Sequence, residues 1–239
     1  MSIAESIARV EEQIADSCRR AMRPRDSVQL MAVSKTHPAE MIMQAYGCGI
    51  RLFGENRVQE FAAKQLELEA AGMSSGSGTA SFHLIGPLQS NKAARAAQIF
   101  GGIDSVDSVR LAQRLDEACA AAAKRLPVLI EIKLSPEATK HGVAPDANEL
   151  HEMLERLPDL KNVMFRGLMT IPPYSDDLEQ VRPYFRRLRA LRDSLAQKYP
   201  ALQFDELSMG MSHDFPVAIE EGSTVVRVGT AIFGARPPA

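Results

Sequence analysis

The chain has 239 residues, of which 45% are hydrophobic and 24% are charged, and its formal net charge is −2 at pH 7. This composition is typical of a globular protein with a full hydrophobic core and excludes a largely disordered chain. The near-neutral balance provides no long-range field for nucleic acid or anionic lipid, so we expect neither as a partner.

Cysteine usage and the N-terminus both indicate the cytoplasm. Cys18, Cys48 and Cys119 are odd in number and show no CxxC spacing, which is typical of a reducing compartment. No basic-then-apolar pattern opens the chain, and no apolar run approaches the roughly 20 residues that span a bilayer. We therefore expect a cytoplasmic protein that does not contact membranes.

Strand and helix patterns alternate along almost the whole chain. Residues 2–22 place Ile3, Ile7, Val10 and Ile14 at helical spacing, which predicts an amphipathic helix before the first strand. Eight strand-like runs follow, and each except the last leads into a helical stretch. The runs cover residues 29–35, 51–55, 82–86, 102–106, 128–134, 164–171, 204–209 and 225–228.

The strand-like runs favour a barrel. Runs such as residues 127–133 are apolar on both faces, as parallel strands covered by helices are. Eight such units in about 200 residues match a TIM barrel. A doubly wound open sheet is the alternative, but it usually carries a glycine-rich fingerprint after its first strand, and residues 34–38 have none. We predict an α/β fold, a single TIM-barrel domain over residues 1–239 with an additional N-terminal helix.

Two further segments stand out between the strands. Residues 71–80 are rich in glycine and serine and predict a surface connector. Residues 176–199 predict a helix that starts or bends near Pro183. Its arginine stripe, which includes Arg186 and Arg189, is typical of a solvated helix face.

Residues that follow the strands of a barrel meet on one face, whatever their distance in sequence. Lys35 closes the first predicted strand, and Asn56 follows the second. Desolvation at the mouth of a pocket favours the neutral form of a lysine amine. A neutral amine forms imines with aldehydes, so Lys35 is the first candidate for covalent chemistry.

Two segments near the C-terminus suit an anion. Ser212 stands before a helical run, where it is expected to act as the N-cap with its hydroxyl and neighbouring amides facing outward. Gly229 and Thr230 follow the last strand, where barrels of this kind often bind phosphate. Asp214 would repel a phosphate if it pointed inward, so we expect it to face away.

Arg227 lies on the last strand among apolar neighbours, so its guanidinium must find an acceptor inside the barrel. One interpretation is a buried salt bridge to Asp205 or Glu206. The other is a contact with the nitrogen of a heteroaromatic ring.

Several motifs in order resemble one known family. They are residues 32–35 (AVSK), 53–60 (FGENRVQE), 83–92 (HLIGPLQSNK), 207–212 (LSMGMS), 226–230 (VRVGT) and 233–234 (FG). Together they resemble the pyridoxal phosphate homeostasis proteins, a family similar in fold to the N-terminal barrel of alanine racemase. The likeness covers practically the whole chain.

The resemblance implies one cofactor, pyridoxal 5'-phosphate (PLP), and a set of residues that bind it. These are Lys35 through a Schiff base, Ser212, Gly229 and Thr230 at the phosphate, Arg227 at the pyridine nitrogen and Asn56 beside the ring. We expect Met169 and His83 as walls of this site, and Tyr174, His37 and His213 at its rim. No metal-ligand spacing occurs in the sequence, so no metal is expected.

The expected function is binding rather than catalysis. Arginine cannot accept the ring proton, so Arg227 would weaken the cofactor as an electron sink. Related racemases are similar in barrel but bring a second domain and a partner-supplied tyrosine, and only five residues follow Gly234 here, so we expect no such domain. We interpret the chain as a monomer without catalytic residues that buffers PLP and delivers it to PLP-dependent apoenzymes.

Two alternatives stay open. One is a PLP-dependent racemase-like enzyme acting on small amino acids. The other is an RNA- or protein-binding module that uses the Lys92/Arg95 and Arg186/Arg189 surfaces.

Overall fold

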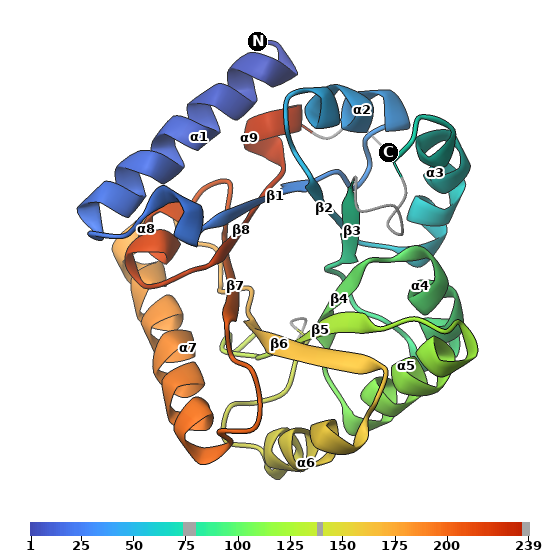
Figure 1. Ribbon diagram of the computed structural model, residues 1–239. Helices are drawn as coiled ribbons and strands as arrows, with labels where there is room; N and C mark the ends of the chain where they lie inside the picture. The colour runs from blue at the N-terminus through green and yellow to red at the C-terminus, as the bar shows by residue number, and fades with distance from the viewer. Residues whose placement is uncertain (74–79, 138–140, 236–239) are drawn as a thin grey trace.

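The computed structural model describes residues 1–73, 80–137 and 141–235. Eight strands form a closed barrel in the order of the chain, and each pairs in parallel with its neighbours, including β8 with β1 (Figure 1). The predicted barrel is confirmed, and the open sheet is wrong. The strands are β1 Gln29–Val33, β2 Leu52–Glu55, β3 Ser81–Leu84, β4 Gly102–Val106, β5 Leu126–Glu131, β6 Val163–Met169, β7 Glu206–Met211 and β8 Val225–Val228.

Helices surround the strands and cover the outer face of the barrel (Figure 1). The α-helices are α1 Ile3–Arg20, α2 Ala39–Gly47, α3 Val58–Ala70, α4 Ala93–Ile99, α5 Val109–Ala121, α6 Asn148–Arg156, α7 Leu178–Lys198, α8 Phe215–Glu220 and α9 Thr230–Phe233. The short 3-10 helices are η1 Arg25–Ser27, η2 Ser90–Lys92 and η3 Leu157–Asp159.

The N-terminal helix α1 is present as predicted. A capping box starts it, in which Ser2 Oγ accepts from the Glu5 N–H at 3.2 Å and Glu5 Oε2 accepts from the Ser2 N–H at 2.8 Å. Its apolar stripe, including Val10 and Ile14, is fully buried. The helix packs against α2, α8 and α9 and so covers the part of the barrel where β8 meets β1 (Figure 1).

Alternation along the strands separates two hydrophobic layers. On β1, Leu30 and Ala32 belong to the large cluster that contains the helices' apolar stripes, whereas Met31 and Val33 belong to a smaller cluster with Val225 of β8. Because successive side chains point to opposite faces, this smaller cluster faces the barrel interior. Arg227 lies two residues after Val225 and therefore also faces inward.

Some predicted details are wrong. The last strand is also followed by a helix, the short α9. The helix predicted within residues 176–199 is present as α7, but it begins at Leu178 and includes Pro183 rather than starting there.

Of the predicted connector at residues 71–80, residues 74–79 lie outside the described part of the chain. In the described ranges, no helix has the length and apolar character needed to span a membrane.

Candidate functional site

A cavity of about 390 Å³ opens at the carboxyl ends of the strands. Its lining includes all six residues predicted to contact a cofactor, namely Lys35, Asn56, Ser212, Arg227, Gly229 and Thr230. Apart from Arg227, which lies on β8, each of these follows the last residue of its strand by one or two positions. The topology of the barrel therefore brings together segments that are far apart in sequence.

Lys35 lies in a tight turn just beyond β1, which ends at Val33 rather than at Lys35. We name residues 34–37 the lysine turn. The Ser34 N–H continues the pairing with β2 by donating to Gly54 O at 3.0 Å, and the His37 N–H closes the turn on Ser34 O at 3.2 Å. Thr36 has φ +66°, a left-handed conformation that costs a β-branched residue about 1–3 kcal/mol. The turn thus needs support from its surroundings.

Arg227 forms the buried floor of the cavity, with only 3% of its surface exposed. Its guanidinium donates at 2.7 Å to Ser208 Oγ and at 2.8 Å to the Thr170 carbonyl oxygen. Burial lowers the pKa of Arg227, and the nearby carboxylates of Asp104, Asp214 and Glu131 oppose that effect. Neither Asp205 nor Glu206 is a hydrogen-bond partner of Arg227, so the salt bridge considered from the sequence does not form.

Asp205 and Glu206 instead face Arg166, each at 3.5 Å. Glu206 begins β7, whereas Arg227 is in register with Met211 at the end of that strand. Glu206 and Met211 are five residues apart along β7, roughly 16 Å at the usual rise. The salt bridge is therefore out of reach for Arg227.

Ser212 does not cap α8, because that helix begins at Phe215 and its N-cap is Asp214. The Ser212 hydroxyl instead accepts from the backbone N–H groups of Gly229 at 3.1 Å and Ala231 at 3.4 Å. Two amides that converge on one oxygen form a suitable anion site. Asp214 does not line the cavity, and its Oδ1 accepts from the Met211 N–H at 2.6 Å.

The rim of the cavity is exposed. Tyr174 is 73% exposed, and its ring lies 5.3 Å from that of His213. A hydrogen bond from the Tyr174 hydroxyl to Asp176 at 2.7 Å raises the pKa of the phenol. His37 was expected at this rim, but it is buried with its ring 5.0 Å from that of Phe233.

Neither of the two predicted wall residues lines the cavity. Met169 is fully buried, and His83 pairs inside the barrel with Asp104, its Nδ1 2.9 Å from the carboxylate. Burial alone would lower the pKa of His83, but the charge and hydrogen bond of Asp104 outweigh it, so that the pKa is raised.

Sequence reasoning missed two groups of residues. The apolar walls of the cavity come from the ends of the strands and the residues just beyond them, namely Val33, Ile85, Ile171 and Met211. The second group, Glu55, Glu60 and Lys64, forms ion pairs directly behind the lysine turn. The available signal was a carboxylate at the end of an apolar strand, Glu55, which is fully buried.

The arginine stripe of α7 is occupied by acidic partners. Arg182 contacts Glu220 at 2.9 Å, and Arg186 contacts Glu221 at 2.9 Å, so these residues join α7 to α8. A surface whose cations are already paired is a poor polyanion site, which counts against RNA binding there.

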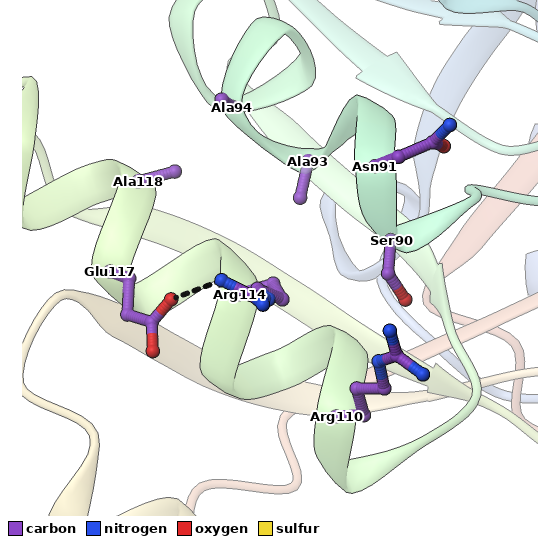
Figure 2. Close-up of a pocket in the computed structure, with 8 residues that line it drawn as sticks. All are labelled: Ser90, Asn91, Ala93, Ala94, Arg110, Arg114, Glu117 and Ala118. Carbon is purple, nitrogen blue, oxygen red and sulfur yellow. Dashed lines mark hydrogen bonds and ion pairs between the residues drawn. The ribbon is translucent and has the colours of Figure 1, made fainter.

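A second cavity, of about 450 Å³, lies between η2, α4 and α5 on the outside of the barrel (Figure 2). Its wall carries Arg110 and Arg114, and Arg114 is paired with Glu117 at 3.1 Å. The helices approach through alanines, including Ala93 and Ala118 (Figure 2). None of the predicted site residues lines it.

Comparisons with known proteins show similarity to one family along nearly the whole chain. Residues 7–237 match the family model described as alanine racemase, N-terminal domain. A protein of Aquifex aeolicus is 44% identical over 99% of both chains, and one of Vibrio cholerae is 43% identical over 98% of this chain and 97% of its own. Both are named pyridoxal phosphate homeostasis protein.

Among solved structures, PipY of Synechococcus elongatus is 42% identical with a TM-score of 0.84, covering 98% of this chain and all of its own. That protein has been solved both without PLP and with PLP bound. Alanine racemase of Clostridium difficile shares the fold at 14% identity, with a TM-score of 0.67 and coverage of 95% of this chain and 57% of its own.

Proposed function

Because the chain belongs to the pyridoxal phosphate homeostasis proteins, which carry the alanine racemase N-terminal domain, we propose that it binds PLP covalently through Lys35. The cofactor is held for buffering and for delivery to PLP-dependent apoenzymes. The observation that carries the proposal is the convergence in one cavity of a lysine amine, a buried guanidinium and two backbone amides.

The cavity fits this cofactor in size and in donors. Its volume of about 390 Å³ is within the range of roughly 300–1,000 Å³ common for small-molecule sites. Gly229 keeps the backbone close to β1, since a Cβ there would lie 3.2 Å from Val33 O. The amides of Gly229 and Ala231, which now converge on Ser212 Oγ, are suitable donors for phosphate oxygens.

The residues divide the binding between them. Lys35 would bond to the aldehyde, Ser212, Gly229 and Thr230 would hold the phosphate, and Asn56 would lie beside the ring. When bound, the cofactor supplies an electron sink for carbanions.

Arg227 determines how strong that electron sink is. Ser208 and Thr170 use two of the five N–H donors of its guanidinium, which leaves others for a ring nitrogen. A guanidinium donates and never accepts, so a ring nitrogen facing Arg227 would stay unprotonated and the electron sink would be weak.

We propose that the protein has no catalytic residues. Racemisation needs an acid or base on each face of the reacting carbon. Tyr174 is the tyrosine of the described cavity lining, but it is 73% exposed, and its raised pKa leaves less of the phenolate that could act as a base. The relatives, too, are named for homeostasis rather than for an enzymatic reaction.

Reductive trapping tests the attachment site. The purified protein is mixed with PLP, its visible spectrum is recorded, and the adduct is reduced with borohydride and mapped by peptide mass spectrometry. We expect the label on Lys35 and none in Lys35→Ala. Lys133→Ala is the matched control and should keep the label on Lys35. Lys133 also lies two residues beyond the end of its strand, β5, but does not line the cavity. Labelling that is unchanged in Lys35→Ala would overturn the proposal.

Delivery is tested with an apoenzyme that requires PLP. The loaded protein is placed either in direct contact with the apoenzyme or across a dialysis membrane, and recovery of enzyme activity is followed. Faster recovery in direct contact would indicate directed transfer, and equal rates would indicate passive release. We also propose a cytoplasmic monomer of one domain, for which light scattering and a single unfolding transition are the tests.

A further inference from the structure

The lysine turn is strained at the residue next to Lys35. Thr36 has φ +66° although it is β-branched, and a backbone hydrogen bond of the turn joins His37 to Ser34. A residue persists in this region only where its surroundings hold it there. The conformation that directs Lys35 into the cavity therefore depends on contacts from outside the turn.

Those contacts come from one face of α3. Lys64 Nζ lies 3.2 Å from Ser34 O and 3.2 Å from His37 O, so a single ammonium contacts both ends of the turn. Glu60, one helical turn earlier, accepts the N–H of Thr36 through Oε1. The same carboxylate lies 3.4 Å from Lys64 Nζ. Two side chains thus hold the strained Thr36 and the carbonyl oxygens at the two ends of the turn.

Glu55 of β2 provides the counter-charge. It is fully buried, and its Oε1 accepts from Lys64 Nζ at 2.8 Å and from Ser34 Oγ at 2.7 Å. Its Oε2 has no hydrogen-bond partner among the described residues. A carboxylate buried in this way is costly unless it is paired, and its bonds go to the lysine turn and to the ammonium that holds it.

We propose that Glu55, Glu60 and Lys64 are positioning residues that hold the lysine turn in its strained form and so present the Lys35 amine to an aldehyde. None of the three lines the cavity, so they act through Lys35. The inference rests on the proposed function, since it concerns how Lys35 is loaded with PLP.

The first test is Lys64→Met, which removes the ammonium and keeps the length of the side chain. We expect PLP loading, followed by its visible absorption, to be at least about tenfold slower, because small displacements of a reacting group have large kinetic effects. In the ligand-free protein, hydrogen exchange at the Thr36 amide should become faster. This second readout does not depend on the cofactor.

Lys124→Met is the matched control. Lys124 Nζ also contacts two carbonyl oxygens, those of Ala97 and Phe100, but behind α4 and away from the cavity. Its loss removes two carbonyl contacts of the same kind and should leave loading unchanged. Comparison of the two variants separates positioning from a general loss of stability.

Rescue by glycine distinguishes the proposed role further. Glycine adopts positive φ without strain, so Thr36→Gly introduced into Lys64→Met should recover most of the lost loading rate. Should Lys64→Met fail to fold, Glu60→Leu replaces it, because the Glu60 side chain is 27% exposed and contacts Thr36 directly. We expect the same slow loading and the same rescue.

The outcomes separate the two proposals. If Lys64→Met loads as fast as wild type while Lys35 carries the label, the positioning role is refuted and the proposed function stands. If Thr36→Gly brings no recovery, the role of the strained turn is refuted. If Lys35 is not labelled in the wild-type protein, the proposed function fails and the inference fails with it.

Discussion

Replacing Arg227 by methionine removes the guanidinium from the cavity floor and keeps a side chain of similar length. Arg227 is 3% exposed and donates to Ser208 Oγ at 2.7 Å and Thr170 O at 2.8 Å. Hydrogen bonds of a charged donor contribute about 1.5–3 kcal/mol each. Burial of the charge opposes them, but its removal leaves Ser208 Oγ and Thr170 O buried without this donor, which costs about 1–3 kcal/mol for each group. We expect a loss of about 3 kcal/mol of unfolding free energy.

Urea unfolding of the ligand-free protein at pH 7, followed by circular dichroism, measures this loss. For a chain of this length the same loss lowers Tm by roughly 6–12 °C. Arg166→Met is the control, because the Arg166 side chain is 35% exposed and its pairs with Asp205 and Glu206 are at 3.5 Å. Such pairs contribute at most about 1 kcal/mol. An Arg227→Met protein no less stable than Arg166→Met would refute the reasoning, since desolvation would then cancel the hydrogen bonds.

Three further predictions concern the phosphate site, the barrel interior and the end of β7. Ser212→Ala should weaken PLP binding about tenfold, the value of one good hydrogen bond, and leave binding of pyridoxal, which has no phosphate, unchanged; equal losses for both ligands in a spectroscopic titration would contradict the assigned role. His83 has its pKa raised above 6.5 by Asp104 against the effect of burial, so the folded protein holds this proton more tightly than the unfolded chain. The resulting stabilisation is complete below pH 6.5 and is lost as the pH rises through the folded pKa. Denaturant titrations across this pH range should therefore show wild type losing stability relative to His83→Gln. Parallel stability-versus-pH profiles of the two proteins would contradict this prediction. Gly210→Ala should cost about 2–4 kcal/mol, because Gly210 has φ +93° and a Cβ there would lie 2.6 Å from Ala218 Cβ. Gly47→Ala, where a Cβ meets nothing within 4 Å, is the control and should be neutral or stabilising. Thermal unfolding measures both variants, and similar Tm shifts for Gly210→Ala and Gly47→Ala would contradict the prediction.

The positions of the strands were predictable because both faces of a parallel barrel strand are buried, which produces short, continuous apolar runs. The ends of the strands were less predictable, because pairing with the neighbouring strands determines where each strand ends. β1 ends at Val33, two residues before the predicted end, and β7 continues to Met211, two residues beyond it. The meeting of Lys35, Ser212 and Gly229 was predictable despite these shifts, since it depends only on all strands ending on one face.

The misplaced start of α8 has a local cause. Ser212 and Asp214 are both good N-caps, and a serine before an apolar run predicts a helix that starts at the serine. Pro216 was the better signal, because proline favours the first turn of a helix and so points to Asp214 as the cap. Ser212 is thereby left to accept from Gly229 and Ala231 of another segment, a contact that no local pattern encodes.

The support of the lysine turn was beyond sequence reasoning for a different reason. Glu60 and Lys64 have the (i, i+4) spacing that usually indicates an exposed helix pair. Because Glu60 and Lys64 pack against the loop after β1, they form hydrogen bonds with the backbone of Ser34, Thr36 and His37 instead of lying free on the surface. Only the three-dimensional arrangement of β1, β2 and α3 reveals that change.

Holding a cofactor and releasing it make opposite demands, and this site assigns them to different residues. Condensation of the Lys35 amine with an aldehyde releases one water molecule, and release of the aldehyde consumes one. Enzymes that use such a cofactor exclude water from the reacting carbon. Here the floor is closed by Arg227, whereas Tyr174 at the rim is 73% exposed and His213 beside it is also exposed. An open rim above a fixed lysine is a poor arrangement for protecting a carbanion, but it lets water reach the bond that a carrier must break, which is why the geometry suits the proposed delivery of PLP better than turnover.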